Sequence, residues 1–212
     1  MKTLFIALFI GLSVAAGWAA DAGQITSLFD GKTFAGWEGD TNGTWRIEEG
    51  ALVGGSLKAQ VPRNEFLRTT RAYTNFVLRL KFKLTGTSGF INAGVQFRSQ
   101  RVVNPANEMC GYQADLGDPN YWGDLYDESR RNKALAKADL EGLNKVLKRD
   151  DWNNYEIRCE GKRIRLAING WQTVDYTESD DAIPGHGLVG LQIHGGGLAE
   201  ARYKDIVILE LP

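Results

Sequence analysis

The sequence predicts an all-β protein, an antiparallel β-sandwich with a short helical insertion. Three observations lead to this fold class. Short segments alternate between apolar and polar residues, glycine is abundant at 25 residues against 5 prolines, and no strand–helix–strand rhythm occurs. Roughly ten short strands of this kind are typical of two packed antiparallel sheets.

The clearest strand is Asn75–Leu84, NFVLRLKFKL, in which every second residue is apolar and the residues between them include Arg79, Lys81 and Lys83. This pattern predicts a half-buried strand with a basic outer face. Further strands are predicted at Thr44–Glu48, Ala51–Gly54, Phe90–Arg98, Gly111–Leu116, Asn154–Glu160, Gly187–His194 and Ala201–Leu211.

Lys162–Asn169 alternates in the same way, and the pair Asn169–Gly170 predicts a hairpin into Trp171–Tyr176. Only Asn132–Lys148 has a helical tendency, which Gly142 interrupts. We therefore expect a helix or two there, inside a long connection between strands.

The first twenty residues have the order of a secretory signal peptide. Lys2 precedes the apolar run Leu4–Leu12, and small residues follow, which predicts cleavage between Ala16 and Ala20. A transmembrane anchor is the competing interpretation, but the apolar run is only half of the ~20 residues that a bilayer requires. We expect a signal peptide over residues 1–20, a single domain over residues 21–212, and an exported protein, periplasmic or secreted, without a membrane anchor after cleavage.

Charge and cysteine content narrow the function classes. The 25 basic residues nearly balance the 26 acidic ones, so no global field attracts nucleic acid or an anionic membrane. Cys110 and Cys159 are the only cysteines, and an oxidising compartment would permit a disulfide between them. Cys159 shares a strand face with Ile157, however, which favours a small buried apolar residue over a bridge.

The segment Gly111–Arg131 concentrates aromatic and ionised side chains: three Tyr, one Trp, four Asp, one Glu and two Arg. Such a loop suggests a saccharide site, where rings stack on sugar faces and carboxylates accept hydroxyl protons. The plain alternative is a solvated loop with a local aromatic cluster. Among the other tryptophans, Trp37, Trp45 and Trp152 are expected in the core.

Three predicted strands carry polar residues on one face. These residues are Asn92, Gln96 and Arg98 in the first strand, Gln113 and Asp115 in the second, and Gln192 and His194 in the third. If the three strands share a sheet, one of its faces would be a polar binding cleft. Otherwise each is an ordinary solvent-facing side of a sandwich strand.

Six segments, in order along the chain, carry a resemblance to a known family: SLFDGKTFAGW (Ser27–Trp37), NAGVQFRS (Asn92–Ser99), GYQADLGD (Gly111–Asp118), LYDESRR (Leu125–Arg131), DWNNYEIRCEGKRIRLAINGWQTVDY (Asp151–Tyr176) and GLVGLQIHGG (Gly187–Gly196). They resemble the DUF1080 family, also called the 3-keto-disaccharide hydrolase domain family. The resemblance covers essentially all of the mature chain. It implies a jelly-roll sandwich of the concanavalin A-like lectin/glucanase type, and the breakdown of glycosides oxidised at C3 of the sugar.

The implied chemistry is an elimination followed by hydration. A ketone at C3 acidifies the C2 proton, because the resulting carbanion is an enolate. A base removes that proton, the aglycone leaves C1 with help from an acid, and added water makes the net reaction a hydrolysis. Such an enzyme needs a base near C2, a platform for the ring, and a cation, hydrogen-bond donor or metal for the enolate oxygen.

With this resemblance, His194 is expected to be the base, because histidine ordinarily titrates near pH 6.5; a metal ligand or a structural strand-end residue are the alternatives. Asp115 and Glu128 are expected to act with it as base, acid or metal ligand, unless they only form surface salt bridges. Arg98 is the candidate electrophile for the enolate oxygen. The residues expected to bind the saccharide substrate are Gln96, Gln113, Tyr121, Trp122, Tyr126, Arg130, Arg131 and Gln192.

A divalent metal cofactor is left open. Asp118, Asp124 and Asp127 could bind Ca²⁺, but their spacing is not that of an EF-hand loop. No zinc-ligand cluster occurs.

Three other functions compete with this interpretation. A non-catalytic, lectin-like carbohydrate-binding module would need only the aromatic and amide residues. A retaining glucanase of this fold usually has a Glu-x-Asp-x-x-Glu run on one strand, which this sequence lacks. A domain that only contacts other exported proteins would lack a polar, aromatic-lined cleft.

Overall fold

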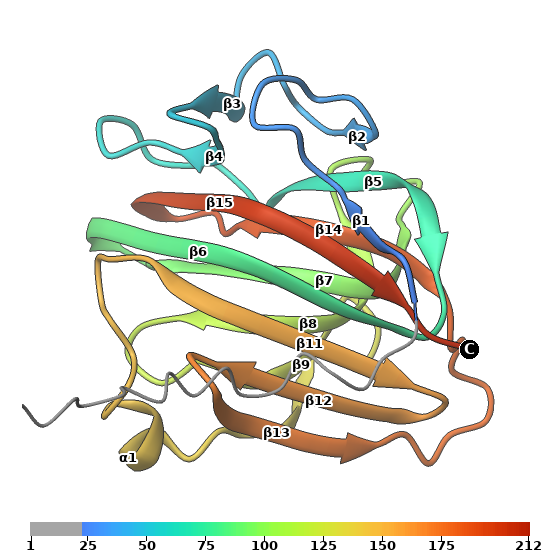
Figure 1. The fold of residues 1–212 in the computed structure, drawn as a ribbon. Helices are drawn as coiled ribbons and strands as arrows, with labels where there is room; N and C mark the ends of the chain where they lie inside the picture. Colours follow the sequence, from blue (N-terminus) through green and yellow to red (C-terminus); the bar gives the residue numbers. More distant parts are fainter. Residues whose placement is uncertain (1–22) are drawn as a thin grey trace, which may run out of the picture.

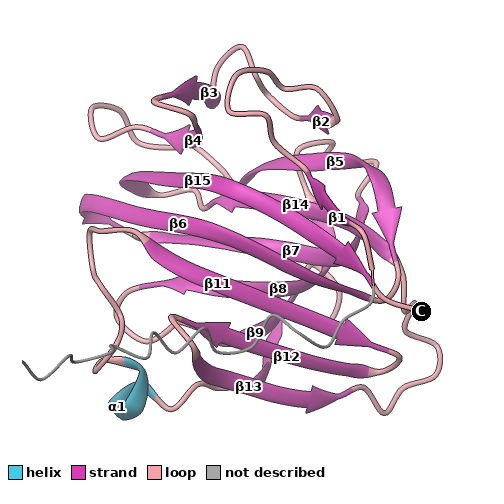
Figure 2. Ribbon diagram, viewed as in Figure 1, coloured by secondary structure: helices cyan, strands magenta, loops and turns pink. Residues whose placement is uncertain are grey.

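The protein is a sandwich of two antiparallel β-sheets, which confirms the predicted fold class (Figure 1). The computed structural model describes residues 23–212, so the predicted signal peptide lies outside the described residues. Strands form nearly all of the regular structure, with one short helix, α1 (Leu140–Leu143), at one end of the sandwich (Figure 2). No helix in residues 23–212 has the length and apolar character needed to cross a membrane.

Sheet A has eight strands in the order β13-β12-β11-β6-β15-β4-β3, and β1 also pairs with β15. Their bounds are β1 (Ile25–Ser27), β3 (Trp45–Glu48), β4 (Ala51–Gly55), β6 (Phe76–Gly89), β11 (Asn153–Glu160), β12 (Arg163–Ile168), β13 (Trp171–Thr177) and β15 (Gly197–Glu210). The predicted hairpin joins β12 to β13: Asn169 and Gly170 have φ values of 50° and 83°, the left-handed values that such a turn requires.

Sheet B has seven strands in the order β10-β9-β8-β7-β14-β5-β2. Their bounds are β2 (Trp37–Glu38), β5 (Glu65–Tyr73), β7 (Asn92–Arg101), β8 (Met109–Gly117), β9 (Leu125–Glu128), β10 (Lys133–Ala136) and β14 (Gly187–Ile193). The three strands predicted to carry one polar face are β8, β7 and β14, and they are neighbours in this sheet. The Asn132–Lys148 connection contains the predicted helical insertion as α1, and it also contains β10, which was not predicted.

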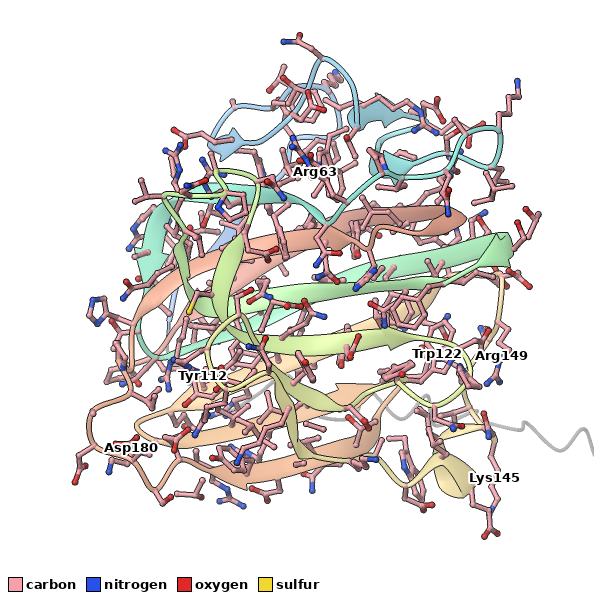
Figure 3. All side chains as sticks on the ribbon, turned by 180° about the vertical axis from the view of Figure 1, so that it is seen from behind. Arg63, Tyr112, Trp122, Lys145, Arg149 and Asp180 are labelled. Atoms are coloured by element: carbon pink, nitrogen blue, oxygen red, sulfur yellow. The ribbon has the colours of Figure 1, made fainter. Side chains whose placement is uncertain are left out.

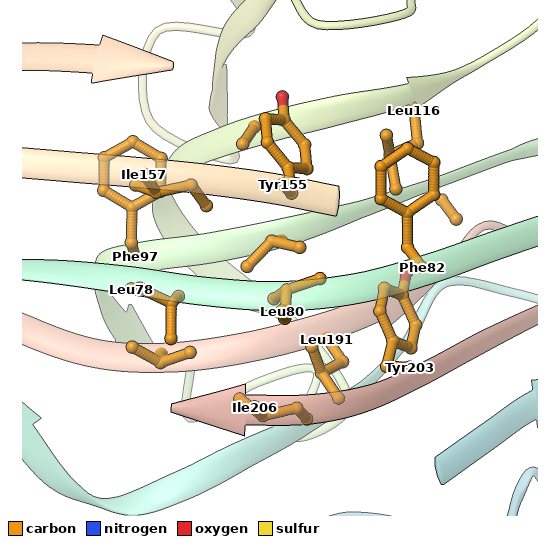
Figure 4. Packing of buried hydrophobic residues seen from close by; sticks show 14 of the residues in the cluster. Leu78, Leu80, Phe82, Phe97, Leu116, Tyr155, Ile157, Leu191, Tyr203 and Ile206 are labelled. Carbon is orange, nitrogen blue, oxygen red and sulfur yellow. The ribbon is translucent and has the colours of Figure 1, made fainter. Parts of the chain in front are cut away.

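The core lies between the two sheets, where every second residue of the central strands points inward (Figure 4). Leu78, Leu80 and Phe82 of β6 pack there against residues of sheet B such as Phe97 and Leu191. Each such side chain contributes roughly 1.5–3 kcal/mol through removal of its apolar surface from water.

One tyrosine links the sheets by hydrogen bonds. The Tyr203 hydroxyl, on β15, donates to the Gln192 carbonyl at 2.8 Å and lies 3.2 Å from that of Gly94. A residue of sheet A therefore links β7 and β14 on their core-facing side. The linked positions, Gly94 and Gln192, are those whose outer side faces the polar residues.

Among the tryptophans expected in the core, Trp37 and Trp45 are buried, but Trp152 is not. Its half-buried ring lies on the outer face of sheet A, with Lys204 Nζ 4.1 Å and Lys83 Nζ 5.7 Å from its centroid. Both cysteines are free thiols, and Cys159 is buried as its strand parity indicates.

Candidate functional site

The outer face of sheet B carries a layer of polar side chains, which we call the polar floor: Asn92, Gln96, Gln113, Asp115 and Gln192. They come from three adjacent strands, and the register sets Gly94 between Gln192 on one side and Asp115 on the other. The neighbouring inward residues of these strands, such as Val95 and Leu191, belong to the core. Strand alternation alone therefore directs the polar side chains outward.

Hydrogen bonds join the members of the polar floor. The Asn92 amide donates to Asp115 Oδ1 at 2.9 Å, and the Gln96 amide donates to Gln113 Oε1 at 2.9 Å. Gln113 lies across Gly94, with its Cδ 2.6 Å from the position that a Cβ would occupy there, so a side chain at Gly94 would displace it.

Sheet B is strongly curved, and its outer face is the concave one. The Gln192 amide on β14 donates to Glu128 Oε2 on β9 at 3.2 Å, although β7 and β8 lie between these strands. A flat sheet would separate the two strands by about 14 Å, and Glu128 pairs with Gly111, four residues along β8 from the row of Gln192, so the two side chains would not meet. The Gln192 Oε1 atom is buried and has no hydrogen-bond partner among the described residues.

Partly exposed residues surround the polar floor, and we call them the rim: Phe90, Glu108, Tyr121, Tyr126, Glu128 and His194. The Phe90 ring lies edge-on to His194, with centroids 4.6 Å apart, and to Tyr121 at 5.5 Å. Tyr121 is 39% exposed, so an aromatic surface is open to solvent at this end of the site. Such a surface suits the apolar face of a sugar ring.

His194 follows β14 and is fixed from two sides. Its backbone N–H donates to the Asn92 carbonyl at 3.0 Å, and its Nδ1 lies 2.7 Å from the Gly195 carbonyl oxygen. A carbonyl oxygen only accepts hydrogen bonds, so Nδ1 carries a proton. The neutral ring then has its lone pair on Nε2, which can take a proton from a ligand.

Burial changes the acidity of the carboxyl groups here. Asp115 is only 4% exposed, and desolvation raises its pKa to about 7, against the hydrogen bonds that it accepts from Asn92 and the Leu116 N–H. Desolvation likewise raises the pKa of Glu128 and of Glu108, the latter also through repulsion by Glu128. All three carboxyl groups therefore hold a proton at higher pH than ordinary ones.

The polar floor is filled by its own side chains and is not an open cleft. Gln96 and Gln192 are fully buried, and Gln113 nearly so. Part of the cover is the β7–β8 loop, whose Asn107 amide donates to the Asn64 carbonyl at 2.9 Å. Met109, after that loop, lies over Gly190 with its Sδ 2.6 Å from the position of a Cβ there.

Arg98 does not lie at this site. The prediction that it stabilises the enolate oxygen is therefore wrong. It sits in a β-bulge of β7 with φ 46°, which reverses the strand parity used to predict its direction. Its guanidinium donates to the carbonyls of Thr74 at 2.8 Å and Gly161 at 2.7 Å. These turns belong to the strand ends of both sheets, so Arg98 ties the sheets together.

Trp122 was expected to stack on a sugar, but it is buried. It packs on Phe82 with ring centroids 6.3 Å apart, and its Nε1 donates to Asp118 Oδ1 at 2.8 Å. Figure 3, which faces sheet B, shows it beside Arg149 at one end of the sandwich, with Tyr112 toward the opposite end.

Arg130 and Arg131 also lie apart from the floor. Both bind the fully buried Asp127, and Arg131 Nη2 also donates to Glu178 at 2.7 Å. Tyr112, buried as its parity indicates, donates its hydroxyl to Glu178 at 2.6 Å. This network connects β8 and β9 to the segment after β13 and has a structural role.

The aspartates proposed for Ca²⁺ are separated from one another. Asp118 accepts from Trp122 and Arg149, Asp124 accepts the Ala138 N–H, and Asp127 binds two arginines. In the described part of the chain, no three His, Cys, Asp or Glu side chains are arranged to hold a metal ion.

Two residues of the site, Phe90 and Glu108, were not predicted, and Asn92 was placed on the polar face without a role. Phe90 precedes Gln96 by six positions, so strand parity alone could have assigned it to the same face. Glu108 lies in the β7–β8 loop, where no periodicity indicates that it reaches Glu128 and His194.

Residues 24–209 match the model of the 3-keto-alpha-glucoside-1,2-lyase-like domain family. The chain belongs to this family. The expected family resemblance is thereby confirmed, and it gives the protein a carbohydrate-related function. No curated protein matches the chain significantly.

Solved structures share the fold of this family member at low sequence identity. A "putative glycosyl hydrolase" from Parabacteroides distasonis is 21% identical, with a TM-score of 0.66 over 90% of this chain and 94% of the other. The carbohydrate-binding module CBM66 from Bacillus subtilis is 16% identical, with a TM-score of 0.61 over 81% and 93%. The Bacillus licheniformis β-glucanase is 11% identical, with a TM-score of 0.53 over 91% and 100%.

Proposed function

We propose that the protein cleaves glycosides oxidised at C3 by removing the C2 proton and expelling the aglycone from C1. The observation that carries this proposal is the joining of His194 and Asp115 through one residue, Asn92. The His194 N–H bonds to the Asn92 carbonyl and the Asn92 amide bonds to Asp115, so a base and a buried acid lie on the same concave face. Family membership supports the substrate class.

His194 is the base in this proposal. Its Nε2 lone pair takes the C2 proton, while the proton on Nδ1 stays hydrogen-bonded to the Gly195 carbonyl. Phe90, edge-on to the imidazole, and Tyr121 next to it provide the surface on which the sugar ring lies.

Asp115 replaces Arg98 as the group that stabilises the enolate. With a pKa raised to about 7 by burial, about half of it is protonated at neutral pH. A neutral carboxylic acid shielded from water donates a strong hydrogen bond to the oxygen on which negative charge develops. Asn92 and Leu116 bind its Oδ1, which leaves Oδ2 to carry the proton.

Glu128 is the acid for the leaving group. Burial raises its pKa, and one of its oxygens already accepts from Gln192, so the other can hold the proton. Transfer of that proton to the glycosidic oxygen breaks the C1–O bond and leaves a double bond between C1 and C2. Addition of water across this bond gives the reducing 3-keto sugar, which makes the net reaction a hydrolysis.

The test uses 4-nitrophenyl β-glucoside oxidised at C3, the same glucoside unoxidised, and a parallel reaction with chelator. We expect nitrophenol from the oxidised glucoside only, and in D₂O we expect deuterium at C2. His194→Gln should reduce the rate by 10²–10⁴-fold. The matched control is His186→Gln, at the exposed second histidine. Release from the unoxidised glucoside would refute the proposal and favour a glucanase.

A lectin-like module is the second candidate function, favoured by the filled polar floor and the exposed aromatic surface at Tyr121. Binding of 3-keto and ordinary glucosides without turnover or C2 exchange would support it. We further propose that the protein acts outside the cytoplasm, on the basis of the signal-peptide pattern in residues 1–20. Loss of these residues from protein recovered outside the cytoplasm is the check.

A further inference from the structure

One arginine on the concave face has almost no compensating partner. Arg68, on β5, lies opposite Gly190 of β14, and its neighbour Leu67 points into the core. Its side chain is therefore directed to the same face as the polar floor. The side chain as a whole is only 9% exposed.

In residues 23–212, the one hydrogen bond of this guanidinium is a long contact of 3.4 Å from Nη2 to Glu38 Oε2. Glu38 is 57% exposed, so solvent weakens the attraction. A guanidinium has five N–H donors in a planar fork, and here most of them are unused. Arg131 shows the ordinary arrangement: although more exposed, it binds two carboxylates.

A second arginine adds to the positive charge. Arg101, exposed at the end of β7, opposes protonation of Arg68 together with desolvation, and the pKa of Arg68 is lowered. Two arginines with one distant carboxylate leave net positive charge in a partly buried place. An anion bound there would offset this charge.

We propose that Arg68 and Arg101 form an oxyanion subsite of the concave face, which receives a carboxylate or sulfate group carried by the glycoside. The planar fork of arginine matches both groups with paired hydrogen bonds. This inference deepens the proposed function and rests on it for the position of the sugar.

The subsite lies at a suitable distance from His194. Gly190, the cross-strand partner of Arg68, precedes His194 by four residues on β14, which corresponds to about 13 Å. That separation is comparable to the length of a disaccharide. With the 3-keto ring at His194, the anionic group belongs to the aglycone side, and Gln192 and Met109 lie between the two positions.

The first experiment measures binding without turnover, by calorimetry at low ionic strength. Glucuronate and glucose 6-sulfate should each bind at least about tenfold more tightly than glucose, and the two anions distinguish a carboxylate from a sulfate ligand. Arg68→Gln should abolish this preference, and Arg101→Gln should weaken it. The matched control is Arg71→Gln, at an exposed arginine of the same strand that pairs with Glu210.

Glu38→Gln provides a test in the opposite direction. It removes the one nearby carboxylate from an exposed position, so folding should be unaffected and anion binding should become tighter by about two- to threefold. Thermal unfolding of each variant identifies loss of fold. Equal binding of glucose and glucuronate by the folded wild-type protein would overturn the inference, as would an unchanged preference in folded Arg68→Gln.

The second experiment separates this inference from the proposed function. The two substrates are 3-keto glucosides of phenol and of 4-hydroxybenzoate, compared by kcat/KM. Faster cleavage of the carboxylate-bearing substrate, lost in Arg68→Gln, supports both proposals. Equal cleavage, insensitive to Arg68, overturns the oxyanion subsite and leaves the proposed reaction standing. Anion binding with no cleavage of either substrate refutes the proposed function alone.

Discussion

Replacing Asp115 by asparagine should stabilise the protein at alkaline pH. The pKa of Asp115 is raised from an ordinary 3.8 to about 7 because burial disfavours the carboxylate. The cost of ionising it in the folded state is absent below pH 3.8, increases as the pH rises toward 7, and stays constant above. About three pKa units correspond to about 4 kcal/mol, an upper bound for one group.

The introduced asparagine cannot ionise, and its side-chain oxygen can accept the same bonds from Asn92 and the Leu116 N–H. Urea unfolding of both proteins between pH 4 and pH 8.5 measures the effect. The unfolding free energy of Asp115→Asn should exceed that of wild type by an increasing amount as pH rises, whereas cleavage of a 3-keto glucoside should fall by at least tenfold. A constant stability difference across this pH range would refute the raised pKa, and full activity would refute the role of Asp115.

Three further predictions follow from other contacts. Burial opposes ionisation of Glu178, but hydrogen bonds from Arg131 and Tyr112 outweigh it and lower its pKa to about 2. In urea unfolding at pH 7, Glu178→Gln should therefore be about 2–3 kcal/mol less stable than wild type. This difference should disappear as the pH is lowered from 4.5 toward 2, because the wild-type carboxylate becomes protonated. Arg98→Met should cost about 3 kcal/mol in the same assay, because two carbonyls lose their donor, while KM stays unchanged; altered KM in the folded variant would return Arg98 to the site. Tyr121→Ala should weaken sugar binding roughly fivefold in calorimetry, and unchanged affinity would exclude this ring as the platform.

A strand could be predicted from the sequence when one of its faces is buried and the other is exposed to solvent. Asn75–Leu84 was predicted correctly because β6 has the core on one side and solvent on the other, which produces strict alternation. Strand β5 was not predicted, because its first five residues, Glu65–Thr69, are all buried. The β7–β8 loop and Met109 cover the outer face of β5, so both faces of this strand are buried. Its sequence therefore does not alternate between polar and apolar residues.

The site was predictable to the extent that side-chain direction followed strand parity. Gln96, Gln113, Asp115 and Gln192 were assigned to one face correctly, since their strands are regular at those positions. Arg98 failed because a bulge changed the parity next to it. For Trp122, loop position suggested exposure, but the loop folds back so that the ring reaches Phe82, and that contact depends on tertiary structure alone.

The two outer faces of the sandwich differ in how their polar groups are satisfied, and this difference supports the proposed ligand site on sheet B. On sheet A, exposed carboxylates and cations form ion pairs across neighbouring strands, such as Arg79 with Glu156 and Arg163 with Asp175. On sheet B, Gln192 has a buried oxygen without a partner among the described residues, and Arg68 has one long contact. A buried oxygen without a partner costs about 1–3 kcal/mol, which a ligand that donates a hydrogen bond to Gln192 would offset. The shared position of Gln192 and Arg68 on the concave face is explained if a polar ligand with hydroxyl groups and an anionic substituent completes their hydrogen bonds.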